Sequence, residues 1–316
     1  MRWWNSVRGG LKSAALNKEG GVRAVWKLLL ACALYLGWTW AAGYGLARGF
    51  GALFEAWNLN ANTLSRAPGW ARLLAENYGR VVSLVSSAGV IALSWGLLRL
   101  FRLGRFPRLR VGHFALGALG GAAVVGLGAA LFLALDSMRL YERGFSFHAD
   151  ILWMLAIYLL AALAEERFAR TLTMRVATAS ARPAWGYAAS ALVLFAMTGS
   201  YALRPLGMVN MLLTAVACAR LSDTGRPGAA AGLRFGWSWA SGGLLAFPGG
   251  NTDAQAGASL YAVSENWLTG GNGGLICGVW MTLALFALLL WLFWPCLRAL
   301  STRLMKKRRD AKAKRV

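Results

Sequence analysis

The sequence predicts an all-α membrane protein, a polytopic bundle of about eight transmembrane helices with both termini in the cytoplasm. The chain of 316 residues is 58% hydrophobic and only 15% charged, whereas soluble chains carry more charge and alternate apolar with polar helix faces. Its apolar residues form long runs, and many of its 34 Lys and Arg residues lie near the ends of these runs. Both features are typical of helices that cross a bilayer.

About 20 apolar residues are needed to cross the hydrocarbon core as a helix. The third predicted span contains the run "LGALGGAAVVGLGAA" (116–130), which favours close helix packing because small residues let backbones approach in lipid. The sixth span is short, and the seventh contains Arg234. The rule predicts spans at 25–47, 81–101, 113–136, 150–166, 184–203, 207–221, 229–247 and 274–298.

The distribution of basic residues predicts the orientation. Eight spans place both termini on one side, together with the connections 102–112 and 167–183, and all of these segments are basic. The connection 248–273, on the opposite side, contains no Lys or Arg. By the positive-inside rule we expect cytoplasmic termini and a multi-pass protein of the cell membrane, with the lipid bilayer as a partner. The net charge of +22 does not indicate nucleic-acid binding, because no basic groove accompanies it.

Two adjacent carboxylates, Glu165 and Glu166, end the apolar run that begins at Ile151. An ionisable group at membrane depth costs about 2.5–3.5 kcal/mol on insertion scales, which favours a functional role. Glu166 and Arg170 are spaced i,i+4, so we expect them to pair, whereas Glu165 lies about 100° further round the helix. A partly desolvated carboxylate beside another suits a general base acting on water. The alternative is a solvated helix end at the interface, since Arg167 follows directly.

An ordered set of motifs follows "EERFAR" (165–170), which itself fits the pattern E-E-x-x-x-R. The apolar stretch 190–202 resembles a helix with F-x-x-x-H, and Phe195 occupies the Phe position. The segment 208–242 contains a Thr-Gly turn, and "ENWLTGGNGG" (265–274) resembles a loop that precedes a last helix. The matching residues of the third motif are Thr224, Gly225, Gly232, Leu233, Phe235 and Trp237. Together these motifs resemble the CPBP family of intramembrane peptidases, which includes CAAX prenyl endopeptidases and bacteriocin-processing or self-immunity proteins.

The resemblance implies a mechanism in which one glutamate activates a water, two histidines assist it and an Asn polarises the scissile carbonyl. In this chain the two histidine positions are Gly199 and Arg234, and the Asn position is Ser238. The only histidines, His113 and His148, fall on no motif.

These replacements argue against efficient hydrolysis. Two glutamates without His or Cys are a poor zinc site, and we expect no metal and no cofactor. Loss of one oxyanion donor typically costs about 100- to 1000-fold in rate. Arg234 could instead bind Glu165 through two hydrogen bonds, which would convert a reactive site into a structural brace.

The favoured interpretation is therefore a degenerate family member that keeps the fold and a polar cavity but acts by binding. Its partner would be a membrane-embedded peptide, a bacteriocin-like ligand or another membrane protein, with Phe195 and Trp237 as substrate-binding residues. A transporter is a weaker alternative, suggested only by charges within the membrane.

The main alternative is an active intramembrane endopeptidase that processes a membrane-associated peptide, either prenylated or bacteriocin-like. Glu165 would then be the base, Glu166 and Arg170 would support it, and Arg234 or Ser238 would supply electrophilic help.

The chain is accordingly divided into four segments. Residues 1–24 are a basic cytoplasmic segment, and 25–149 contain the first three transmembrane helices. Residues 150–298 are the CPBP-like core, and 299–316 form a basic cytoplasmic tail. The resemblance points to a bacterial cytoplasmic membrane.

Overall fold

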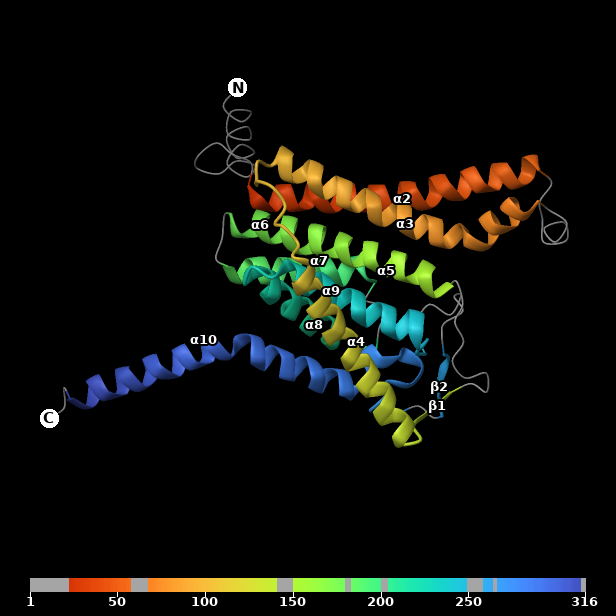
Figure 1. The fold of residues 1–316 in the computed structure, drawn as a ribbon. Coiled ribbons are helices and arrows are strands. Elements are labelled where there is room, and N and C mark those ends of the chain that lie inside the picture. The colour runs from red at the N-terminus through yellow and green to blue at the C-terminus, as the bar shows by residue number, and fades with distance from the viewer. Residues whose placement is uncertain are drawn as a thin grey trace, which may run out of the picture.

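The computed structural model of the chain is an almost entirely helical bundle (Figure 1). It describes residues 23–57, 68–140, 150–179, 183–199, 204–248, 258–263 and 266–313. The predicted all-α class is confirmed for these residues, apart from one short two-stranded sheet.

Helices α2 (Ala24–Ala56) and α3 (Gly69–Leu100) form an antiparallel pair along one side of the bundle (Figure 1). The Trp38 indole of α2 donates a hydrogen bond to the carbonyl oxygen of Ser86 in α3, at 3.0 Å. Large apolar side chains on the outside of α2, such as Leu29 and Trp40, are exposed. A bilayer would cover this face.

Five described helices are long and apolar enough to cross a membrane, as a multi-pass membrane protein requires. They comprise residues Ala24–Ala56, Asn77–Leu100, Val111–Ala134, Pro205–Asp223 and Val279–Ala299. The other three predicted spans correspond to shorter helices in the middle of the sequence.

The first of these, α5 (Asp150–Glu165), does not end at the carboxylates. It continues into the π-helix η2 (Glu166–Leu172) and then α6 (Thr173–Thr178). The predicted connection 167–183 is therefore helical for most of its length. At the end of the π-helix, the Thr173 hydroxyl donates to the carbonyl oxygen of Phe168, five residues back, at 3.0 Å.

Three helices surround this segment. They are α7 (Pro183–Met197), α8 (Pro205–Asp223) and α9 (Pro227–Ser238), which continues into the π-helix η4 (Trp239–Leu244). Each of the three begins with a proline, whose fixed φ and missing N–H suit the first helical position. α7 is shorter than the predicted span 184–203, of which residues 200–203 lie outside the described part of the chain.

Helix α4 (Val111–Ala134) crosses the bundle obliquely and packs very closely on α9 (Figure 1). A Cβ at Gly117 or Gly121 of α4 would overlap backbone atoms of α9, and one at Gly232 or Gly236 would overlap backbone atoms of α4. The close packing predicted from the small-residue run of α4 is thus present, with α9 as the partner.

The remaining elements lie around the last helix. Strand β1 (Met138–Leu140) pairs antiparallel with β2 (Leu260–Ala262), a sheet that the sequence did not predict. Two 3-10 turns, η5 (Gly271–Gly273) and η6 (Leu275–Cys277), lead into α10 (Val279–Ala313), which extends beyond the bundle toward the C-terminus (Figure 1).

Candidate functional site

The two carboxylates lie where α5 becomes the π-helix η2. As neighbours on one helix, Glu165 and Glu166 point in different directions, and their partners come from different elements. Glu165 binds a residue of α9, whereas Glu166 binds one of α8 and one of its own helix. A π segment within an α-helix is frequently found at a functional site.

Glu165 and Arg234 form the ion pair predicted from the motif position. The Arg234 Nε donates to Glu165 Oε2 at 2.7 Å, and Nη2 donates to Oε1 at 2.9 Å. The two side chains are only 12% and 9% exposed. Both carboxylate oxygens therefore accept a charge-assisted hydrogen bond, in the fork-to-fork geometry that makes such pairs strong and specific.

Glu166 has a less complete set of partners. Its Oε1 accepts a hydrogen bond from the Ser222 hydroxyl at 2.8 Å, and its Oε2 lies 3.5 Å from Arg170 Nη1. Glu166 and Arg170 are both fully buried, so the predicted i,i+4 pair is present and the alternative of a solvated helix end is wrong. Among the described residues, Glu166 Oε2 and all three Arg170 nitrogens lack a hydrogen-bond partner.

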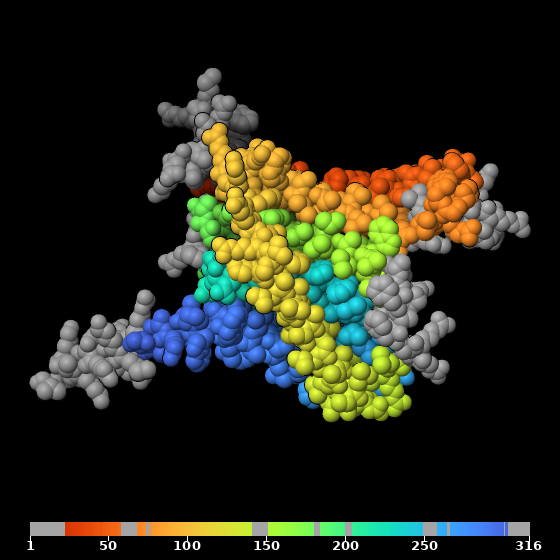
Figure 2. All heavy atoms as spheres, in the orientation of Figure 1, coloured from red at the N-terminus to blue at the C-terminus, as the bar shows by residue number. Residues whose placement is uncertain are grey.

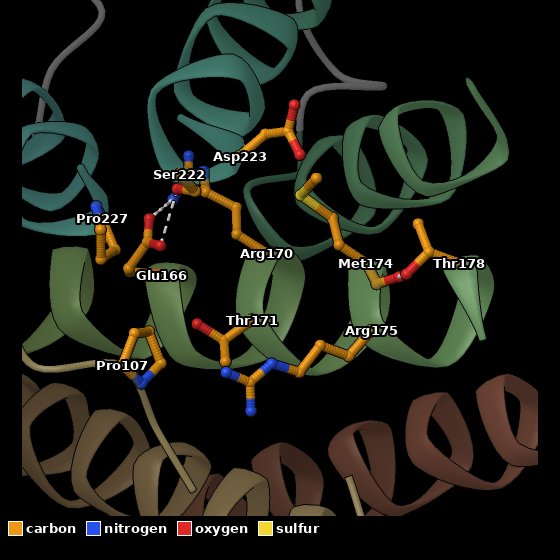
Figure 3. A pocket seen from close by; sticks show the side chains of 10 residues that line it. All are labelled: Pro107, Glu166, Arg170, Thr171, Met174, Arg175, Thr178, Ser222, Asp223 and Pro227. Carbon is orange, nitrogen blue, oxygen red and sulfur yellow. Dashed lines mark hydrogen bonds and ion pairs between the residues drawn. The ribbon is translucent and has the colours of Figure 1, made fainter. Parts of the chain in front are cut away.

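A cavity of about 270 Å³ lies beside this second pair (Figure 3). Glu166, Arg170 and Ser222 line it, while Glu165 and Arg234 do not. The complete lining is Pro107, Glu166, Arg170, Thr171, Met174, Arg175, Thr178, Ser222, Asp223 and Pro227.

The loop between α3 and α4 closes one side of the cavity. Arg175 donates from Nη1 to the carbonyl oxygens of Leu103 and Arg105, at 3.0 and 2.7 Å, and Arg167 donates to that of Pro107 at 3.1 Å. Arg167 of η2 and Arg175 of α6, which the sequence pattern placed in an interfacial connection, thus hold this loop against the two helical segments.

Ser222 is the site residue that the sequence did not reveal. It lies in the last turn of α8, where its hydroxyl is also within hydrogen-bond distance of the carbonyl oxygen of Cys218, at 3.0 Å. The only signal was its place two residues before the Thr224–Gly225 turn of the third motif.

The predicted substrate-binding residues lie away from this cavity. Trp237 is 8% exposed and belongs to a hydrophobic core cluster with Phe132 and Leu275. Phe195 is half-buried in α7 and is not among the residues that line the cavity. Ser238, at the end of α9, is half-buried, and its carbonyl oxygen accepts a hydrogen bond from Ser241.

Gly199, which the resemblance would place at the second-motif histidine position, is not helical. It follows the end of α7 with φ of 64°, in the left-handed region, where a residue with a Cβ costs about 1–2 kcal/mol. A histidine side chain at this position would therefore be disfavoured by the backbone.

The described residues contain no group of three or more His, Cys, Asp and Glu side chains that could hold a metal ion. His113 lies in the first turn of α4, and His148 lies outside the described residues.

No family model, curated protein or solved structure matches the chain.

Proposed function

We propose that the chain is a degenerate member of the CPBP family that binds a membrane-embedded peptide or a partner membrane protein without hydrolysing it. The observation that carries the proposal is the two-hydrogen-bond pair between Arg234 and Glu165. A general base must present a free lone pair to a water within hydrogen-bond reach. Here a guanidinium takes one lone pair on each oxygen of the carboxylate expected to do this work, and both side chains are nearly buried from water.

The proposal includes the topology. Eight segments cross the membrane, and both termini lie in the cytoplasm of a bacterial cell. The three shorter crossings are formed by α5, α7 and α9. The basic connection 102–112 lies on the same side as the Glu166 cavity that it helps to close.

The polar lining of the cavity supports a binding role. The buried Arg170 guanidinium and Glu166 Oε2 have no hydrogen-bond partner among the described residues, and such groups carry a free-energy cost that a polar ligand group would relieve. A peptide group offers both a donor and an acceptor. We therefore infer that a peptide segment, entering from the cytoplasmic side, contacts this pair.

Photo-crosslinking in cells tests this inference. A photoreactive amino acid replaces Met174, which lines the cavity, or Leu127, which is exposed on α4 and serves as the matched control. We expect the photoreactive residue at position 174 to crosslink to one or a few uncleaved membrane peptides. Glu166→Gln should lower the yield of these crosslinks. Identical crosslinks from both positions would overturn the proposal.

A second candidate is hydrolysis with Glu166, in place of Glu165, as the base. Its support is that Glu166 lines the cavity and has one oxygen without a hydrogen-bond partner among the described residues. The length of the crosslinked peptide distinguishes the two candidates. Only hydrolysis would give a shortened peptide on the unmodified protein and a full-length peptide on Glu166→Gln.

A further inference from the structure

A second concave site lies on an apolar face of the bundle, where Leu116 and Trp291 are exposed. This groove of about 400 Å³ runs between α4 and α10, with α8 and α9 at its base. Figure 2 shows turquoise atoms of the α8–α9 region between the yellow α4 and the blue α10. We call it the α4–α10 groove. It shares no lining residue with the Glu166 cavity, so it is independent of the function proposed above.

The walls of the α4–α10 groove are apolar. Leu233, Leu288 and Trp291 line it from α9 and α10. On α4, Gly120 contributes open space, since a Cβ there would meet no atom within 4 Å. The volume lies within the roughly 300–1,000 Å³ of typical ligand sites.

One end of the groove is cationic. Arg226 is exposed at the N-cap of α9, and His113 lies in the first turn of α4. The two helices begin side by side, because a Cβ at Gly228 would lie 3.0 Å from the carbonyl oxygen of Arg110. Neither first turn contains an acidic residue. Two helix N-termini and an exposed arginine together attract an anion.

An apolar channel with a cationic end matches an amphiphile with an anionic head. An extended peptide fits poorly, because the apolar walls would leave its backbone N–H and C=O groups without partners in lipid. We propose that the α4–α10 groove binds a phospholipid with an anionic headgroup. One acyl chain lies against Leu233, Leu288 and Trp291, and the phosphate lies at Arg226 and the first turn of α4.

The test uses the full-length protein in nanodiscs. Two lipid probes, phosphatidylglycerol and phosphatidylcholine, carry the same photoreactive acyl chain, and mass spectrometry maps the labelled residues. A basic residue near an anionic lipid surface contributes about a fivefold preference. We expect about fivefold more labelling of the groove by the phosphatidylglycerol probe, and this comparison needs no variant.

Two pairs of variants then distinguish the contribution of the lipid headgroup to binding from that of the acyl chain. Arg226→Gln should reduce phosphatidylglycerol labelling about fivefold, to the level of phosphatidylcholine, whereas Arg105→Gln removes an exposed charge elsewhere and should change nothing. Gly120→Leu fills the groove and should abolish labelling by both lipids, whereas Gly126→Leu lies in open space on the same helix and should not.

Equal labelling by both lipids, or an Arg226→Gln variant that behaves as the unmodified protein, would overturn the proposal. Preferential labelling of the groove by a prenylated peptide probe over phosphatidylglycerol would overturn it as well, since the occupant would then be a lipidated peptide.

Discussion

Arg234 decides the chemistry of the site at the scale of single residues. The proposed membership of the CPBP family places it where that family has a histidine, a residue that can accept and release a proton. A guanidinium remains protonated at all physiological pH values, so it cannot act as a proton shuttle. It instead binds both oxygens of Glu165.

Breaking this pair on one side should be costly. Arg234→Leu leaves Glu165 buried without its partner, and we expect a loss of about 3–5 kcal/mol in the free energy of unfolding. The double variant Glu165→Leu/Arg234→Leu removes both charges and should recover most of that loss. Unfolding in mixed detergent micelles measures the cycle, and additive losses in the double variant would show that the two residues are not coupled.

Ser222→Ala tests the second carboxylate. It removes the hydrogen bond to Glu166, and hydrogen bonds to charged groups contribute about 1.5–3 kcal/mol. The control is Ser94→Ala, because Ser94 is buried and, among the described residues, its hydroxyl donates to the Val90 carbonyl oxygen of its own helix. The same assay should show the larger loss for Ser222→Ala, and equal losses would contradict the role given to Ser222.

The sequence was sufficient to predict both ion pairs but not Ser222. Spacing places Arg170 on the face of Glu166, and the motif order places Arg234 opposite Glu165. A serine near the end of an apolar helix has no comparable signature, and its partner lies 56 residues away in the chain.

At the scale of elements, sequence periodicity did not predict the two π-helices, η2 and η4. Apolar periodicity and charge predicted that the helix containing Glu165 ends near residue 166, yet it continues to Thr178. The helix can continue past Glu166 because each of the three arginines that follow has a polar partner. Arg170 lies beside Glu166, and Arg167 and Arg175 donate to carbonyl oxygens of the loop between α3 and α4. Those partners depend on tertiary contacts that no local pattern encodes.

The packing of α4 on α9 makes a prediction at this scale. Gly232→Ala would place a methyl group against the backbone of α4, and such overpacking costs about 1–3 kcal/mol. Gly120→Ala, on α4 itself, meets open space and should be neutral or slightly stabilising, since alanine favours a helix. Thermal unfolding of the two variants compares them directly. Equal melting temperatures would show that the two backbones are not in close contact.

At the scale of the whole molecule, the distribution of charge predicts the topology. Ser301, in the part of α10 that extends beyond the bundle, and Val263, directly after β2 near the other end of the bundle, are both exposed (Figure 1). In a chain without its own four cysteines, Val263→Cys should react with a membrane-impermeant thiol reagent on intact cells. Ser301→Cys should react only after permeabilisation. The reverse pattern would contradict cytoplasmic termini.

The central claim is that Glu165 braces the bundle and does not activate water. The most direct test uses the membrane peptide that photo-crosslinking identifies. This peptide is incubated, without a crosslink, with the purified protein in lipid, and mass spectrometry measures its hydrolysis by the unmodified chain and by Glu165→Gln. We predict no hydrolysis that depends on Glu165, with peptide binding retained in the unmodified protein. Cleavage by the unmodified protein that disappears in Glu165→Gln would contradict the claim.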